Sequence, residues 1–144
     1  MDLGKIYIDH IGIATNSLDE GSKFWNLIGL SNNLPDELVA DQGVTTRFFE
    51  TSNDNSGTQS PPMIELLEPT GKDTPIGKFI EKRGIGIQQL CLRVENIEKV
   101  ISHLINNGIR MIDAEPRLGS HGALIAFVHP KSTGGVLVEL AQKT

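Results

Sequence analysis

The chain repeats itself after 79 residues, and no other feature of the sequence constrains its fold as strongly. Residues 5–15 form an alternating apolar run of the kind found in strands, and residues 86–94 form a second one. His10 in the first run falls on Gln89 in the second (10 + 79 = 89). Self-similarity at a fixed spacing indicates that one supersecondary unit occurs twice.

A helix is predicted after each of these two strands. The first helix begins after a capping residue at position 16 or 17 and ends near Leu27, ahead of a glycine. Phe24 and Trp25 are expected to face the sheet from this helix, because large aromatic side chains bury apolar surface well. The second helix is expected to end near residues 107–108.

Two later strands complete each copy of the repeat. Residues 45–49 fall on residues 124–128 at the same spacing of 79, whereas Glu65 falls on Glu139 at a spacing of 74 (139 − 65 = 74). The difference of five is assigned to a polar, turn-rich loop at residues 51–57, where an insertion is tolerated. The order of elements in each copy is therefore βαβββ.

These observations predict an α+β fold in a single domain that covers residues 1–144. Module one comprises residues 5–68 and module two comprises residues 85–144. A connector at residues 69–84 joins them, and residues 73–75 can start a short helix in it. A chain of 144 residues suits one compact domain, or two very small ones that share a core.

Each module carries one polar residue in its first strand and one in its last strand, where the neighbours are apolar. These residues are His10 and Glu65 in module one, and Gln89 and Glu139 in module two. Taken singly, each is better explained as an ordinary hydrogen-bonded or solvent-facing strand residue. Chance would not place polar residues at both pairs of equivalent positions, however. An imidazole, an amide oxygen and two carboxylates suit a divalent cation, so the four together predict a metal site.

Composition and charge exclude other classes of function. The net charge is −5 and no basic stripe is present, which argues against a nucleic-acid partner. Cys91 is the single cysteine, so no intrachain disulfide can form and a reducing compartment is favoured. The first residues do not follow the order of a signal peptide, and no apolar run reaches membrane-spanning length. We expect a cytoplasmic protein without a membrane partner.

Five segments carry a resemblance to a known family. They are residues 8–14 (IDHIGIA), 64–69 (IELLEP), 73–76 (DTPI), 119–122 (GSHG) and 129–140 (HPKSTGGVLVEL). Together they resemble the methylmalonyl-CoA epimerases, within the glyoxalase/vicinal-oxygen-chelate (VOC) superfamily. The resemblance extends over nearly the whole chain, and the last segment is the most specific. It implies a glyoxalase/bleomycin-resistance-like fold, in which the two modules form a curved mixed sheet around a metal cleft, and a homodimer.

The resemblance also implies an activity and a ligand set. The activity is a metal-dependent epimerisation of a 2-methylmalonyl thioester by 1,1-proton transfer through an enediolate. The metal ligands carried over are the four residues already found from the repeat: His10, Glu65, Gln89 and Glu139. Cobalt or manganese is expected ahead of zinc or nickel. Glu65 and Glu139 are the candidate catalytic bases, one for each face of the planar intermediate.

Further residues carried over from the family would contact the substrate. The candidates are His121, and Lys131, Ser132 and Thr133 in the loop before the last strand. Lys131 could hold a phosphate of the acyl carrier, which is either coenzyme A or a carrier protein. An exposed hairpin lysine without a ligand explains Lys131 equally well.

The sequence departs from the family at two places. The family has two adjacent histidines where this chain has Gln88 and Gln89, and an amide oxygen binds late transition metals more weakly than imidazole does. Residues 45–49 contain no acidic residue, although some family members hold a second base on this strand. Two alternatives therefore stay open: a VOC enzyme for another thioester or a glyoxalase-type substrate, and a metal-free small-molecule-binding protein of the resistance type.

Overall fold

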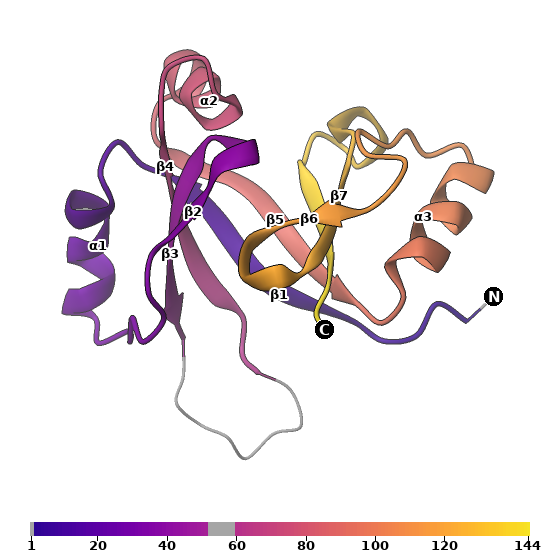
Figure 1. Ribbon diagram of the computed structural model, residues 1–144, viewed down its shortest axis with the longest axis horizontal. Coiled ribbons are helices and arrows are strands. Elements are labelled where there is room, and N and C mark those ends of the chain that lie inside the picture. Colours follow the sequence, from indigo (N-terminus) through magenta and orange to yellow (C-terminus); the bar gives the residue numbers. More distant parts are fainter. Residues whose placement is uncertain (1, 52–59) are drawn as a thin grey trace. The chain divides into compact units, whose positions relative to one another are not determined.

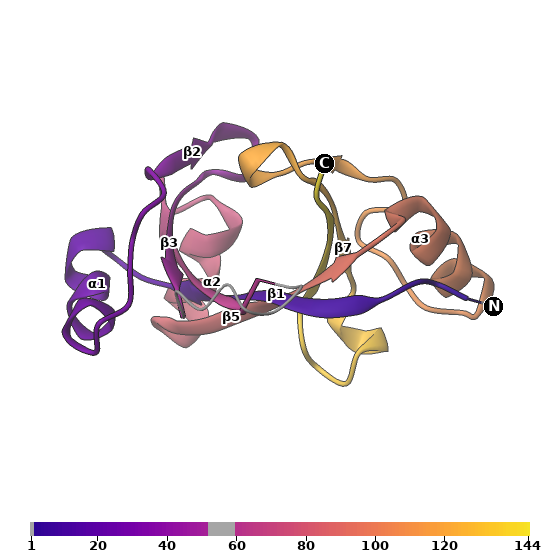
Figure 2. The same cartoon turned by 90° about the horizontal axis from the view of Figure 1, so that it is seen from below.

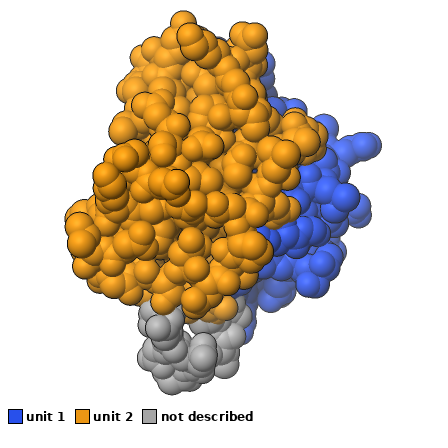
Figure 3. Space-filling model, turned by 60° about the vertical axis from the view of Figure 1, so that its left-hand side comes forward, with its two compact units in different colours: residues 1–9, 89–144 blue, residues 10–88 orange. Residues whose placement is uncertain are grey.

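The computed structural model describes residues 2–51 and 60–144; residues 52–59, which include most of the predicted insertion, lie outside the described residues. The chain forms two compact units. Unit 1 comprises Met1–Asp9 and Gln89–Thr144, and unit 2 comprises His10–Gln88 (Figure 3). Unit 2 therefore contains most of module one together with the connector, whereas unit 1 contains most of module two together with the first residues of the chain.

Unit 2 is a four-stranded mixed sheet with two helices (Figure 1). Its strands lie in the order β2-β3-β4-β1, in which β1 and β4 are parallel and the other neighbours are antiparallel. Its elements are the end of β1 (Ile6–Ala14), α1 (Leu18–Leu27), β2 (Glu37–Val39), the short 3-10 helix η1 (Ala40–Gln42), β3 (Val44–Glu50), β4 (Met63–Pro69) and α2 (Pro75–Arg83).

The two helices of unit 2 cover opposite faces of its sheet. Leu18 and Trp25 of α1 pack with Leu66, and Ile76 of α2 packs with Leu67. Leu66 and Leu67 are neighbours on β4, and successive side chains of a strand point to opposite faces. Figure 2 shows α1 and α2 on the two sides of β3. The helix predicted in the connector is confirmed as α2, which Thr74 caps.

Phe24 does not face the sheet, and this prediction is wrong. Trp25 is half-buried, whereas 59% of Phe24 remains exposed and its ring meets the Trp25 ring edge-on. Consecutive residues of a helix point about 100° apart, so the two aromatics cannot both face one sheet. The face that packs on the sheet carries Leu18, Ser22 and Trp25, spaced four and then three residues apart.

Unit 1 has the same architecture without a second long helix. Its strands lie in the order β5-β8-β7-β6, in which β5 and β8 are parallel and the other neighbours are antiparallel. Val100 and Ile101 of the helix pack with Ala126 and Leu140 of the sheet. The elements are the start of β1, β5 (Gly86–Val94), α3 (Ile97–Asn106), β6 (Arg117–Leu118), η2 (Ser120–Gly122), β7 (Leu124–Val128), η3 (Pro130–Ser132) and β8 (Val138–Gln142).

The strand pairing repeats residue by residue. Phe48 lies opposite Glu65 in the β3–β4 pair, and Phe127 lies opposite Glu139 in the β7–β8 pair. These partners obey the spacings found in the sequence, because 48 + 79 = 127 and 65 + 74 = 139. The predicted α+β fold made of two βαβββ copies is confirmed.

The contact that starts each helix also repeats. The backbone N–H of Leu18 donates to Glu68 Oε1 at 2.9 Å, and that of Ile97 donates to Gln142 Oε1 at 2.8 Å. A side chain at the end of the parallel strand thus satisfies an unpaired N–H of the first helical turn in both copies. In the part of the chain that is described, no helix combines the length and the apolar character needed to cross a membrane.

Candidate active site

His10 and Glu65 form a buried pair within unit 2. The Nε2 atom of His10 lies 3.1 Å from Oε1 of Glu65, and both side chains are almost fully enclosed. The parallel pairing of β1 with β4 places Gly12 opposite Glu65. Gly12 is two residues after His10 and lies on the same face of β1, so His10 and Glu65 share one face of the sheet.

Phe48 encloses this pair from the neighbouring strand. It is buried, it lies opposite Glu65 in the β3–β4 register, and its ring meets the His10 imidazole edge-on at a centroid distance of 5.2 Å. Such T-shaped packing favours one orientation of the two rings. Phe48 therefore restricts the imidazole and keeps water from the pair.

Gln89 and Glu139 form the equivalent pair within unit 1. The Nε2 atom of Gln89 donates a hydrogen bond to Oε1 of Glu139 at 3.1 Å, and both side chains are buried. An amide that donates through Nε2 keeps its Oε1 as an acceptor. Cys91, opposite Glu139 on β5, is fully buried in an apolar cluster.

The chemistry of these four side chains fits a divalent cation. Each of the two pairs consists of a buried carboxylate beside one neutral or protonatable donor. Burial of a carboxylate is costly unless positive charge or hydrogen bonds compensate it. An imidazole nitrogen, an amide oxygen and two carboxylates offer ligands of the types that first-row divalent metals bind.

His121 lies in η2 and has a strained backbone. Its φ is 55°, which makes it the one non-glycine residue with positive φ among the described residues, and its side chain is exposed. This left-handed conformation is uncommon for histidine, and such residues cluster at functional sites.

The loop around η3 brings together the other predicted substrate contacts. Lys131 is exposed, but the hydroxyls next to it are used within the loop. Ser132 Oγ accepts from the backbone N–H of Arg110 at 2.9 Å, and Thr133 Oγ1 donates to the carbonyl of Pro130 at 3.2 Å. The loop is thus held by Ser132 and Thr133, and Lys131 projects from it.

Arg110 and His129 lie against this loop, and neither was singled out as a site residue from the sequence. The backbone N–H of His129 donates to the carbonyl of Arg110 at 2.9 Å. Desolvation, and then the positive charges of Arg110 and Lys131, lower the pKa of His129 below its ordinary value of 6.5. The repeat could not have identified Arg110, because Arg110 lies in a segment between helix and strand that has no regular apolar spacing. His129 belongs to the segment that resembles the family, but it is not one of the polar residues that the repeat places at equivalent strand positions.

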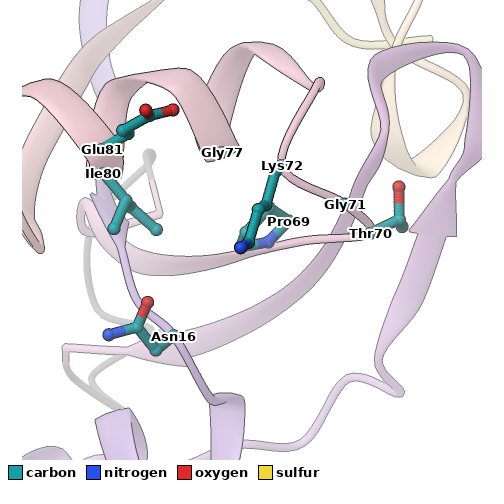
Figure 4. A pocket seen from close by; sticks show the side chains of 8 residues that line it. All are labelled: Asn16, Pro69, Thr70, Gly71, Lys72, Gly77, Ile80 and Glu81. Carbon is teal, nitrogen blue, oxygen red and sulfur yellow. The ribbon is translucent and has the colours of Figure 1, made fainter.

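Unit 2 also contains a cavity of about 530 Å³ that is separate from His10 and Glu65. It lies between α2 and the turns that follow β1 and β4, and Figure 4 shows several of its side chains. The lining includes the apolar residues Pro69 and Ile80 and the polar residues Asn16, Lys72 and Glu81. The sequence analysis assigned no function to these residues.

Comparisons with known proteins agree with this architecture. Residues 9–127 match the model of the glyoxalase/bleomycin resistance protein/dioxygenase superfamily. The mitochondrial methylmalonyl-CoA epimerase of Dictyostelium discoideum is 38% identical, over 98% of this chain and 82% of the relative. The ethylmalonyl-CoA/methylmalonyl-CoA epimerase of Cereibacter sphaeroides is 35% identical, over 94% of this chain and 96% of the relative.

A solved structure gives the same result. A variant of the Streptomyces coelicolor methylmalonyl-CoA epimerase in complex with 2-nitronate-propionyl-CoA superposes with a TM-score of 0.87 and is 32% identical. The match covers 96% of this chain and 94% of that chain. At this identity and coverage, the likeness extends to sequence as well as fold.

Proposed function

Because this chain belongs to the glyoxalase/bleomycin resistance protein/dioxygenase superfamily and, within it, to the methylmalonyl-CoA epimerases, we propose that it interconverts the two C2 configurations of a 2-methylmalonyl thioester. The observation that carries the proposal is the pair of buried carboxylates, Glu65 and Glu139, at equivalent positions of the repeat. Each has a polar partner at 3.1 Å, namely His10 or Gln89. Coenzyme A is the proposed carrier, since a CoA-linked ligand is present in the related Streptomyces coelicolor structure.

In this proposal His10, Glu65, Gln89 and Glu139 bind one divalent metal ion, with cobalt or manganese ahead of zinc or nickel. A divalent cation, when bound, stabilises negative charge on a thioester oxygen and a carboxylate and so makes the C2 proton more acidic. The repeat and the chemistry of the four donors support this ligand set.

Glu65 and Glu139 are the proposed bases. One carboxylate removes the C2 proton, the carbon becomes planar in the enediolate, and the other carboxylate's acid form returns a proton to the opposite face. His10 and Gln89 hold their carboxylates in place from 3.1 Å away. The phenylalanines opposite the two glutamates, Phe48 and Phe127, add no competing acid or base.

Four more residues are proposed as substrate contacts: His121, Lys131, Ser132 and Thr133. The strained backbone of His121 and the exposed position of Lys131 support the first two. Ser132 and Thr133 would act mainly by shaping the loop, because their hydroxyls bond to its backbone. A cytoplasmic homodimer is proposed from the resemblance to the family.

A second candidate is another reaction of the same superfamily, on a different thioester or a glyoxalase-type substrate. Two observations favour it. Gln89 offers an amide where the family has an imidazole, and residues 45–49 of β3 include no acidic residue. Both differences alter the side chains proposed to bind the metal or to transfer protons, whereas the fold stays the same.

The test is C2 proton exchange of methylmalonyl-CoA in heavy water, followed by NMR, with metal-free protein and with added cobalt or manganese. Metal-dependent exchange is the expected result. A tightly bound metal without exchange would support the second candidate. Neither metal binding nor exchange would favour a metal-free binding protein.

A further inference from the structure

The hydroxyl of Thr46 is buried within unit 2 and has no hydrogen-bond partner among the described residues. Only 2% of Thr46 is exposed, and its Oγ1 atom is shielded from solvent. A buried polar group without a hydrogen bond lowers the stability of a protein, and native structures contain few such groups. The hydroxyl of Thr46 therefore needs a physical explanation.

The equivalent position in the other copy of the repeat shows that the fold does not require a hydroxyl there. Thr46 falls on Ile125 (46 + 79 = 125), which is buried in an apolar cluster. The strand partners correspond as well, because Thr46 lies opposite Leu67 and Ile125 lies opposite Ala141 (67 + 74 = 141). An apolar β-branched side chain fits this position of the sheet, so packing does not account for the hydroxyl of Thr46.

Thr46 lies on the same face of the sheet as the buried pair His10 and Glu65. Thr46 and Phe48 are two residues apart on β3, so their side chains share one face. Phe48 contacts the His10 ring and lies opposite Glu65. Thr46 lies opposite Leu67, two residues beyond Glu65 on β4. Diagonal neighbours on one face of a sheet are about 7–8 Å apart, so one small ligand group can contact both Thr46 and Glu65.

The groups beside Thr46 do not satisfy its hydroxyl. Val44 and Leu67 belong to the apolar cluster that packs against Ile76 of α2. Glu37 of β2 is the register partner of Thr46 on the other side, yet its carboxylate accepts no hydrogen bond from the hydroxyl. Thr46 thus stands at the edge of an apolar cluster, next to the polar pair.

The hydroxyl and the polar pair are shielded in the same way. Oγ1 of Thr46, Nε2 of His10 and Oε1 of Glu65 are all closed to solvent. A ligand that reaches Glu65 has to separate the side chains that cover this face, and Thr46 is the diagonal neighbour of Glu65 on it. A donor that is satisfied only by a ligand destabilises the free protein and favours the bound state.

We propose that the Thr46 hydroxyl donates a hydrogen bond to an oxygen of the malonyl group when the acyl thioester binds beside Glu65. This inference rests on the proposed function, which supplies the acyl group. The acceptor is either the free carboxylate, which is charged throughout the reaction, or the thioester oxygen, on which negative charge develops in the enediolate. Hydrogen bonds to charged acceptors are the stronger ones, so either oxygen suits the hydroxyl. Thr46 itself neither removes nor returns the C2 proton.

Thr46→Val tests the free protein first, because valine keeps the shape of threonine and lacks the hydroxyl. Removal of an unsatisfied buried donor should raise the equilibrium constant for folding about tenfold. Urea unfolding of the ligand-free full chain measures the change. Unchanged or lower stability would overturn the inference, since it would show that a group of the protein, such as Glu37, satisfies the hydroxyl.

The same variant should be a poorer enzyme although it is more stable. Loss of a hydrogen bond to a charged acceptor should lower kcat/KM for epimerisation about tenfold to a hundredfold in Thr46→Val. A raised KM with unchanged kcat would assign the bond to the carboxylate, which is charged in the ground state and the transition state alike. A lowered kcat with unchanged KM would assign it to the thioester oxygen.

Two further variants separate the hydroxyl from its surroundings. Thr46→Ser keeps the hydroxyl and should recover most of the activity that Thr46→Val loses. Thr45→Val is the matched control, because Thr45 is half-buried on the opposite face of the same strand. It should leave kcat and KM unchanged. No recovery in Thr46→Ser, or an equal loss in Thr45→Val, would overturn the role of the hydroxyl.

Binding of unreactive thioesters tests Thr46 independently of catalysis. Dimethylmalonyl-CoA has no C2 proton, and isobutyryl-CoA is the same acyl group without the carboxylate. In isothermal titration, a bond to the carboxylate predicts that Thr46→Val weakens the binding of dimethylmalonyl-CoA alone. A bond to the thioester oxygen predicts weaker binding of both compounds.

Wild-type kinetics and wild-type affinity for both compounds in Thr46→Val would overturn the inference. Proton exchange at C2 of methylmalonyl-CoA separates this failure from failure of the proposed function. Exchange at the same rate in the wild type and Thr46→Val would remove the role of Thr46 alone. Binding of dimethylmalonyl-CoA that depends on Thr46, without exchange, would remove the epimerase alone. A wild-type chain that binds neither thioester would remove both.

Discussion

Gln89 donates from Nε2 to Oε1 of Glu139 at 3.1 Å, in the position where the other copy of the repeat sets His10 against Glu65 at 3.1 Å. The two contacts are equivalent, because 10 + 79 = 89 and 65 + 74 = 139. Module two therefore has an amide, that of Gln89, at the position where module one has the imidazole of His10, and both groups lie beside an equivalent carboxylate. The 3.1 Å contact with the carboxylate is the same in both copies, but the atom offered to a metal differs.

Gln89→His should strengthen the binding of cobalt, nickel and zinc, on the order of tenfold, because imidazole is a better ligand than an amide oxygen for these ions. Isothermal titration of the metal-free protein measures the change. Gln88→His is the control, since the neighbouring strand residue points to the other face of β5. Equal gains in the two variants, or no gain in Gln89→His, would remove Gln89 from the ligand set.

Glu65→Gln and Glu139→Gln should each lower the rate of C2 deuterium exchange at least about a hundredfold, since each removes a proposed base. The measurement is NMR of methylmalonyl-CoA in heavy water. Glu68→Gln should exchange at the wild-type rate, because Glu68 caps α1 and an amide oxygen performs the same task at Gln142. Wild-type exchange in both Glu65→Gln and Glu139→Gln would contradict their assignment as bases.

Asp36→Asn should lower stability by up to about 1 kcal/mol at neutral pH, because Arg47 Nε and Nη2 each donate to the Asp36 carboxylate at 2.8 Å in a partly exposed position. The hydrogen bonds from Arg47 hold the pKa of Asp36 below its ordinary value of 3.8. The unfolded chain thus binds this proton more readily, so the stabilisation is present above pH 3.8 and is lost as the pH falls through the lower folded pKa.

Urea unfolding of the wild type and Asp36→Asn between pH 7 and about pH 2.5 tests this linkage. The difference in unfolding free energy should stay constant at neutral pH and shrink below the ordinary pKa of the carboxyl. A difference that is independent of pH down to the lowest value would show that the charge of Asp36 contributes nothing to stability.

Gly77→Ala should destabilise unit 2 by about 1–3 kcal/mol. A Cβ there would lie 2.3 Å from the carbonyl oxygen of Gly71 and 2.8 Å from that of Lys72, and backbone atoms cannot move aside as a flexible side chain can. The clash outweighs the gain of about 1 kcal/mol that alanine normally brings to a helix. Thermal unfolding measures the loss.

Gly71→Ala is the matched control within the same turn. A Cβ at Gly71 would meet no described atom within 4 Å, so this variant should be neutral or slightly stabilised, by about 0.4–1 kcal/mol, through the unfolded state. Equal stability of Gly77→Ala and Gly71→Ala would show that α2 can shift away from the turn.

Much of the local structure follows from short-range patterns in the sequence. The spacing of 79 predicts equivalent helices in the two copies, and α1 and α3 indeed begin at Leu18 and Ile97 (18 + 79 = 97). Ser17 caps α1 and Asn96 caps α3 by the same side-chain contact, because their oxygens accept the N–H of the third residue on. Phe24 shows where short-range patterns fail to predict the structure. Its position in the first helix was predicted, but the side of the helix on which it lies was not.

The sequence alone determined the two βαβββ copies, the register that relates Glu65 to Glu139, and the four polar residues that interrupt apolar strands, because strand and helix periods are local properties of the chain. Tertiary structure decided which groups meet. It set the His10 imidazole against Phe48, it used the hydroxyls of Ser132 and Thr133 within their own loop, and it brought Arg110 to His129. No sequence period predicts these contacts, because they join irregular segments or neighbouring strands whose side-chain directions depend on how the chain packs.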